Sequence, residues 1–289
     1  MWPMMGYIFM SLSALSYCLM SIFVKLVGSE LMTVQIVFVR GLITLVITFL
    51  ILRHNKVAPF GNNQIVLTIR GVVGTVALFL VYESLHRLSL PEATVIQYLY
   101  PIFTAFFASL IISEHIGRVL HFAIIMGLVG VYVILDFPFI GSEKIPTIDA
   151  FIALSGAFLT GLSYVMVRKA SKLKESPYVI MFYFPLFTVP MSLFFLPENW
   201  VTPTATGWVY LVMIGISSQL GQLFLTFGYE LLPASRAAMT SYLQVPFSVI
   251  AGIIIFNDVI TLNFMVGTLI ILFTTGMVII KENSKDHGI

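Results

Sequence analysis

Residues 78–114 read LFLVYESLHRLSLPEATVIQYLYPIFTAFFASLIISE, and a diverged copy of this stretch begins 145 positions later, at Leu223. The copy reads LFLTFGYELLPASRAAMTSYLQVPFSVIAGIIIFND, so that Pro101 corresponds to Pro246. Each stretch holds an apolar segment, a short polar turn and a second apolar segment of about 20 residues, the length that crosses a lipid bilayer as a helix. The pattern therefore predicts a transmembrane helical hairpin that occurs twice in a chain of two related halves.

The composition of the whole chain is typical of a membrane protein. Its 289 residues are 59% hydrophobic and 10% charged, and the mean hydropathy is +1.01. A water-soluble domain has about 25% charged residues, so that class is excluded. Short connections leave no room for a separate soluble domain, and the predicted fold class is an all-α integral membrane protein. Hydropathy predicts ten transmembrane helices, at residues 4–27, 33–52, 65–82, 93–112, 119–135, 150–167, 178–196, 207–227, 237–256 and 262–280.

The basic residues of the connections are concentrated on one side of the predicted bundle. If the N-terminus is cytoplasmic, most of them lie on the cytoplasmic side, and only Lys25, Arg87 and Lys144 lie opposite. Both termini are therefore predicted to be cytoplasmic, in a multi-pass protein of the cytoplasmic (inner) membrane. The same residues are too dispersed to form a nucleic-acid surface. Cys18 is the only cysteine, which excludes an intramolecular disulfide and a cysteine-based metal site.

The duplication extends over most of the chain. Ser16 and Tyr17 in the first predicted span recur as Ser163 and Tyr164 in the sixth. Two halves, residues 6–136 and 148–281, then hold five spans each. Because five is an odd number, the second half is predicted to lie upside down relative to the first. This inverted repeat is the construction of many secondary transporters, whose substrate site lies near the midplane between the halves.

The sequence RGVVG at residues 70–74, followed by LSLPEATVIQYLYPIFTAFFASLIISE at residues 88–114, resembles the EamA group of the drug/metabolite transporter superfamily. The resemblance covers nearly the whole chain and implies ten transmembrane helices in two inverted repeats. It also implies that helices one to four and six to nine surround a central cavity, with the fifth and tenth packed outside them. The second copy departs from the pattern, because Val259, preceded by Asn257 and Asp258, stands at the position of Glu114.

Polar side chains inside the predicted spans are the candidates for a substrate site, since each costs free energy in lipid unless it meets water, a partner or a substrate. They form stripes at helical spacing. Amides would hydrogen-bond a substrate, and tyrosines would stack on a planar or cationic group. The alternative for each of them is interhelical hydrogen bonding or core packing. The predicted substrate-binding residues are Gln97, Tyr98, Gln219, Gln222, Gln244, Tyr17, Tyr164, Tyr242 and Arg40.

Two arginines near or within the spans have different predicted roles. Arg40 lies about a third of the way into the second span, where its guanidinium would hold a carboxylate or phosphate, or serve instead as a structural lock. Arg70 lies closer to the cytoplasmic end of the third span and is interpreted as an anchor that extends to the membrane interface. The repeat aligns Gln219 with Gly74, so a substrate is expected to lie asymmetrically between the halves.

Pro101 and Pro246 are the predicted gating residues, because each removes a backbone hydrogen bond within a span. The sequence has no P-loop, dinucleotide fingerprint or hydrolase motif, so neither an enzyme nor a cofactor is expected. Its histidines lack metal-ligand spacing, so no metal site is expected. Glu83, Glu92 and Glu114 lie near span ends, where water is expected to solvate them. The predicted spans have no carboxylate at mid-depth that could bind a proton, which favours uniport or exchange.

The function that these patterns predict is secondary transport of a small polar metabolite by alternating access. The resemblance allows an amino acid or an amino-acid-derived nucleoside such as S-adenosylmethionine. Two alternatives remain open: a lipid-linked carrier flippase, which needs a basic site open to lipid, and an integral membrane enzyme, which needs a catalytic constellation at depth. The expected partners are the small-molecule substrate and membrane lipid, with the protein a monomer or a homodimer.

Overall fold

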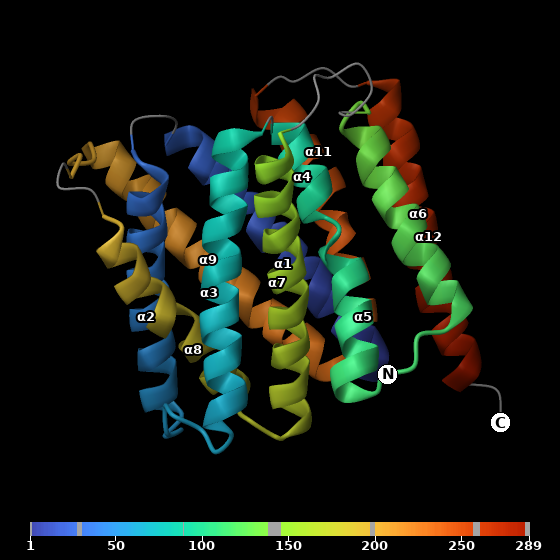
Figure 1. The fold of residues 1–289 in the computed structure, drawn as a ribbon, viewed down its shortest axis with the longest axis horizontal. Helices are drawn as coiled ribbons and strands as arrows, with labels where there is room; N and C mark the ends of the chain where they lie inside the picture. The colour runs from blue at the N-terminus through green and yellow to red at the C-terminus, as the bar shows by residue number, and fades with distance from the viewer. Residues whose placement is uncertain are drawn as a thin grey trace.

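A computed structural model describes residues 2–27, 31–88, 90–137, 146–196, 200–256 and 261–286. Every regular element in these ranges is a helix (Figure 1). Residues 138–145, which belong to the connection between the two predicted halves, lie outside the described residues. So does the end of the second copy, from Asn257 to Val259. The helices are α1 (Trp2–Val27), α2 (Thr33–His54), α3 (Gln64–Arg87), α4 (Leu90–Gln97), α5 (Tyr100–Ile112), α6 (Arg118–Ile134), α7 (Thr147–Lys172), α8 (Pro177–Phe194), α9 (Ala205–Leu231), α10 (Ala234–Thr240), η2 (Ser241–Leu243), α11 (Gln244–Phe256) and α12 (Leu262–Asp286).

The described helices supply the predicted membrane spans. Nine segments have the length and hydropathy of a span, and two of these are built from consecutive shorter helices. The remaining apolar helix, α6, has 17 residues, which at 1.5 Å per residue is about 25 Å of helix. The prediction of an all-α membrane protein with ten transmembrane segments is confirmed.

The packing between helices shows the predicted inverted repeat. Helix α1 packs against α9, and their counterparts in the other half, α7 and α3, also pack against each other. Likewise α5 contacts α7, and α11 contacts α1. Helices at equivalent positions, α2 with α8 and α6 with α12, form pairs. Exchanging the two halves therefore maps each of these contacts onto another of them.

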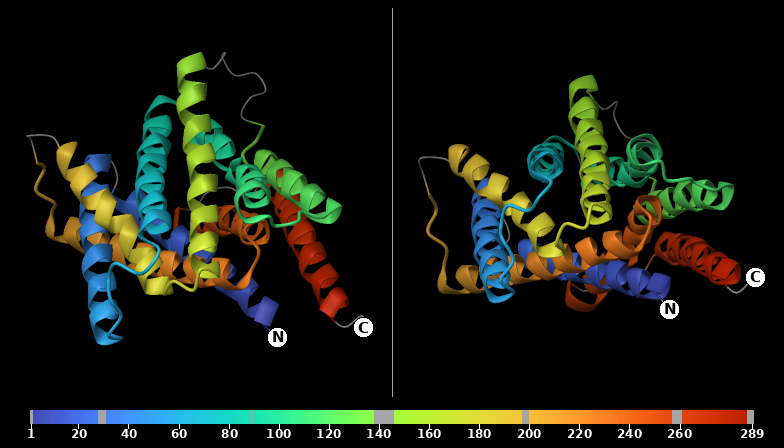
Figure 2. Two further views of the ribbon diagram at one scale, coloured as in Figure 1. Left: turned by 60° about the horizontal axis from the view of Figure 1, so that its bottom comes forward. Right: turned by 90° about the horizontal axis from the view of Figure 1, so that it is seen from below.

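Helices α6 and α12 lie side by side at one edge of the bundle (Figures 1 and 2). Two glycines permit this close approach. A Cβ atom on Gly130 would lie 2.9 Å from the carbonyl oxygen of Gly267, so a larger residue there would push the two backbones apart. The fifth and tenth spans are thus a peripheral pair, as the resemblance implied, and the remaining spans form the main bundle.

Each of the two spans that contain a repeated proline is interrupted just before that proline. Helix α4 ends at Gln97 and α5 begins at Tyr100, so that Pro101 occupies the first turn of α5. In the second half, η2 separates α10 from α11, and Pro246 lies in the first turn of α11. Proline fits a first turn because the N–H groups there have no partner within the helix. The bends are present in both halves, and the gating role of the two prolines stays a prediction.

Candidate functional site

A pocket lies where α1, α2, α8 and α9 meet, so that each half of the chain contributes two helices to it. Its empty space, counted together with the open space at its mouth, is about 370 Å³. Four of the predicted site residues line it, namely Tyr17, Arg40, Gln219 and Gln222. The other lining residues are Gly41, Thr44, Met181, Phe184, Pro185, Thr188 and Ser218.

Tyr17 and Gln222 form a hydrogen bond across the interface between the halves. The Tyr17 hydroxyl donates to Gln222 Oε1 at 2.8 Å. The Tyr17 ring lies against α9 because Gly221 has no side chain, and a Cβ atom there would lie 3.0 Å from the ring. Since Oε1 already accepts this bond, the amide's Nε2 is oriented away from Tyr17. In the described part of the chain that buried nitrogen has no hydrogen-bond partner.

Gln219 lines the same pocket, but its amide is satisfied by the protein. Its Nε2 donates to Thr48 Oγ1 at 2.9 Å, and the Thr48 hydroxyl is 3.2 Å from Gln219 Oε1. Both side chains are buried. Gln219 therefore joins α9 to α2, whereas Gln222 retains an unused donor at the pocket wall.

Arg40 lines the pocket without a carboxylate partner among the described residues. Its side chain is buried, with the residue 8% exposed. The one hydrogen bond seen for its guanidinium in those residues is to the thioether sulfur of Met20, at 3.5 Å. A thioether is a weak acceptor, so most of the donor capacity of Arg40 is unused.

Arg70 does not extend to the membrane interface, so its interpretation as an anchor is wrong. It is only 2% exposed, because α7 and α8 pack over this part of α3. Its Nη1 donates to Ser163 Oγ at 2.8 Å, and its Cζ lies 4.9 Å from the centre of the Phe184 ring. Because Phe184 lines the pocket, Arg70 lies directly behind the pocket wall.

The RGVVG sequence explains how α3 accommodates this buried guanidinium. A Cβ atom on Gly74, one helical turn after Arg70, would lie 2.8 Å from Ser163 Oγ and would also collide with Arg70 Nη1. A glycine four residues after an arginine leaves a groove along which the arginine can lie. That spacing was the one sequence signal of a buried rather than an exposed Arg70.

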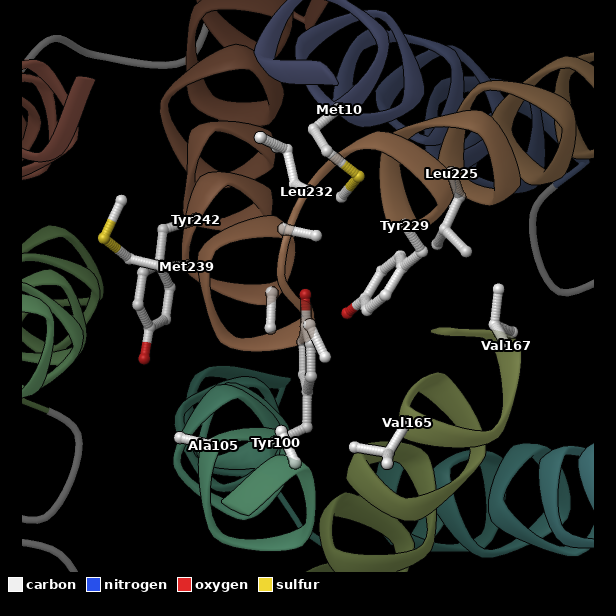
Figure 3. Close-up of a cluster of buried hydrophobic side chains, with 14 of the residues drawn as sticks. Met10, Tyr100, Ala105, Val165, Val167, Leu225, Tyr229, Leu232, Met239 and Tyr242 are labelled. Carbon is white, nitrogen blue, oxygen red and sulfur yellow. The ribbon is translucent and has the colours of Figure 1, made fainter. Parts of the chain in front are cut away.

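Three of the predicted tyrosines lie in an aromatic cluster beside the pocket rather than in its wall. The rings of Tyr98 and Tyr242 are 5.8 Å apart, and the Tyr242 hydroxyl donates to the carbonyl of Tyr98 at 3.2 Å. The Tyr164 ring packs against Tyr100 at 5.4 Å and Tyr229 at 5.3 Å. Figure 3 shows Tyr100 and Tyr229 pointing their hydroxyls toward each other among apolar side chains. These contacts fit core packing, and a binding role for the tyrosines stays a prediction.

The remaining two predicted residues lie at the breaks in the two interrupted spans. Gln97 is the last residue of α4, and its Nε2 donates a long hydrogen bond of 3.4 Å to Thr160. Its buried Oε1 has no partner in the described residues. Gln244 is half-buried at the start of α11. The structure does not bring either residue into the wall of the pocket.

A cluster of charged side chains around Glu114 lies on the side of the bundle that carries both termini. Glu114 accepts hydrogen bonds from Arg168 Nε at 3.0 Å and from the backbone N–H of Ala234 at 2.7 Å, and Lys172 Nζ lies 3.1 Å away. Its side chain is 9% exposed. Ser113, in the left-handed conformation with φ 51°, ends α5 and turns the chain there. The expectation that water solvates Glu114 is therefore wrong.

A second carboxylate joins two turns on the same side of the bundle. Glu175 accepts hydrogen bonds from the backbone N–H of Asn62 at 2.9 Å and from Asn63 Nδ2 at 2.7 Å. These contacts tie the α2–α3 turn to the α7–α8 turn, and so one half to the other. Among the described residues, no group of three histidine, cysteine or acidic side chains has the arrangement of a metal site.

Comparison with known proteins identifies the family of this chain. The model of the EamA-like transporter family matches residues 4–136 and 147–280. The chain belongs to this family. The EamA chain is 26% identical over 255 residues to the pseudopaline exporter CntI of Pseudomonas aeruginosa, with 88% of each chain covered. It is 24% identical over 284 residues to the S-adenosylmethionine uptake transporter of Rickettsia prowazekii, with 97% of this chain and 94% of that protein covered.

Two further comparisons extend this result. The EamA chain is 27% identical over 292 residues to solute carrier family 35 member G1 of Mus musculus, with 96% of this chain and 79% of that protein covered. A solved crystal structure superposes with a TM-score of 0.82 at 16% sequence identity and covers 94% of the chain, which shows a shared fold. The predicted resemblance is thus confirmed, and the protein is a multi-pass membrane transporter of the drug/metabolite type.

Proposed function

We propose that this protein is a secondary transporter that moves a small polar metabolite across the cytoplasmic membrane by alternating access, as a uniporter or exchanger. The observation that carries the proposal is the polar pocket to which α1 and α2 of one half and α8 and α9 of the other contribute. A pocket at the interface between inverted repeats opens to one side or the other when the halves rock against each other. An amino acid or an amino-acid-derived nucleoside such as S-adenosylmethionine belongs to the proposed substrate range.

Gln222, Tyr17 and Arg40 are the proposed substrate-contacting residues of this pocket. They combine an amide, a phenol and a guanidinium in a wall that also holds the apolar side chains of Met181, Phe184 and Pro185. A few convergent polar groups in an apolar cavity are typical of small-molecule sites. The two amides differ, because Gln219 is hydrogen-bonded to Thr48 whereas Gln222 has an unused donor. This difference supports an asymmetric position of the substrate.

The flippase alternative finds less support than transport of a soluble metabolite. A lipid-linked substrate would need a basic site in a crevice open to lipid. Arg70 is only 2% exposed and Arg40 only 8%, in a pocket lined by four helices. The relatives named above are transporters, so we also place an enzymatic role below transport.

Counterflow in proteoliposomes tests the proposed function. Vesicles preloaded with a mixture of amino acids, nucleosides, carboxylic acids and sugar phosphates should take up a labelled member of the mixture faster than unloaded vesicles do. Absence of counterflow for every member, with protein that is folded and correctly inserted, would contradict the proposal.

The orientation requires its own experiment. Reporter fusions after Lys56 and Lys172 should report the cytoplasm, and a fusion near Lys144 should report the opposite side. A cytoplasmic signal at Lys144 would overturn the proposed orientation without bearing on the pocket.

A further inference from the structure

The unused hydrogen-bonding groups at the pocket are donors. Gln222 Nε2 is buried and has no partner in the described residues, and Arg40 has only the sulfur of Met20. Arg70 Nε, behind the wall, is also buried without a partner in those residues. The two amide oxygens of the wall are occupied, since Gln222 Oε1 receives the Tyr17 hydroxyl and Gln219 Oε1 lies 3.2 Å from the Thr48 hydroxyl. A buried donor without an acceptor destabilises the protein, so this arrangement matches a ligand that supplies acceptors.

The pocket also has an excess of positive charge. A guanidinium stays protonated in proteins. Among the described residues, no carboxylate lies within ion-pair distance of Arg40 or Arg70, whereas Arg87 and Arg168 both have one. Arg40 and Phe184 both line the pocket, and the Arg70 guanidinium carbon lies 4.9 Å from the centre of the Phe184 ring, so the two cations lie around one region. A buried charge is costly unless a counterion pairs with it.

We propose that the transporter selects organic anions, with a carboxylate or phosphate of the substrate held by Arg40 and by the free N–H of Gln222. This inference rests on the transport function proposed above and narrows its substrate class. Arg70, behind Phe184, adds a second positive charge that favours a substrate of net negative charge. S-adenosylmethionine, whose sulfonium and ammonium outweigh its single carboxylate, then falls outside the preferred class.

A structural role of Arg40 makes an opposite prediction about stability. If Arg40 served as a lock between helices, Arg40→Met would lower the melting temperature of the ligand-free protein. If its counterion is the substrate, replacing the unpaired cation with an apolar side chain of similar length leaves that temperature unchanged or raises it. A clear fall in the melting temperature of ligand-free Arg40→Met would overturn the proposal.

The binding experiment is a thermal-shift titration of purified protein with ligands that differ in net charge. The anions are succinate, citrate and glycerol 3-phosphate, which separate carboxylates from phosphates. Glutamate, glutamine and lysine form a series of similar size, and S-adenosylmethionine is the cationic nucleoside. We expect saturable stabilisation by anions. Arg40→Gln should raise the dissociation constant by about 10- to 100-fold, and Arg87→Gln, which changes an exposed arginine, should leave it unchanged.

The outcomes separate this inference from the proposed function. Stabilisation only by glutamine, lysine or S-adenosylmethionine would overturn anion selection and leave transport standing. Stabilisation by no anion would overturn it as well. In that case, counterflow of any metabolite in proteoliposomes would show that the transport function survives, and its absence would show that both proposals fail.

Discussion

Arg168 and Arg40 are buried arginines in the same bundle, but the described protein supplies a carboxylate to only one of them. Arg168 is paired with Glu114 and also donates to the carbonyl oxygens of Tyr229 and Glu230. In the described residues, Arg40 donates a hydrogen bond to the thioether sulfur of Met20 instead. A cation with its own counterion holds helices together, whereas a cation without one is available to a ligand. Arg168 therefore forms a structural contact on the side of the termini, whereas Arg40 is the proposed binding group of the pocket.

The largest expected effect concerns the paired arginine. Glu114→Gln leaves Arg168 and Lys172 without their carboxylate, and should cost about 3 kcal/mol of stability. This is the low end of the range for breaking a buried pair, because Lys172 is 39% exposed. The melting temperature in detergent measures the loss. Glu83→Gln, which removes the exposed partner of Arg87, is the control and should cause no measurable change. An equal fall in melting temperature in the two variants would contradict a stabilising role of the buried Glu114.

The next effect tests the space that α3 provides for Arg70. Gly74→Ala places a Cβ atom 2.8 Å from Ser163 Oγ and 3.2 Å from the Phe184 ring. Overpacking of this kind costs about 1–3 kcal/mol, and movement of Phe184 should also weaken substrate binding. Gly276→Ala in α12 is the matched control, because nothing lies within 4 Å of its Cβ position. Wild-type stability and binding in Gly74→Ala would contradict the buried position of Arg70.

A smaller effect distinguishes the two glutamines of the pocket. Gln222→Ala removes a free donor and should weaken substrate binding by about 1–2 kcal/mol. It also removes the acceptor of the Tyr17 hydroxyl, so its melting temperature should fall as well. Gln219→Ala leaves the buried Thr48 hydroxyl without its partner, and should lower the melting temperature with little effect on substrate binding. Binding titrations and thermal unfolding of both variants measure the contrast. Unchanged binding in Gln222→Ala would assign that residue to helix packing.

The smallest expected effect is that of a pH gradient. Glu83 and Glu114 lie at helix ends in the structure, and no described span has a carboxylate in its middle that could bind a proton in exchange for substrate. Substrate counterflow should therefore proceed at the same rate after the gradient is collapsed with an ionophore. Proton-driven accumulation that is lost in Glu83→Gln would refute uniport or exchange and identify the coupling residue.

The sequence by itself determined the class and the symmetry of this protein. Apolar segments of span length and a stretch repeated after 145 positions are local patterns, and they predict helices and their duplication without knowledge of any contact. An odd number of spans in each half then requires the inverted arrangement. Pro101 and Pro246 also predicted the interrupted spans, because the loss of a backbone donor is a local property.

Only the tertiary structure decided which polar groups are satisfied. Gln219 finds Thr48 at a separation of 171 residues, and Arg70 finds Ser163 at a separation of 93. Burial of Glu114 likewise depends on a cation contributed by α7. Whether a polar side chain forms a structural bond or stays free for a substrate depends on neighbours brought in by helix packing. The sequence pattern of one helix does not contain that information.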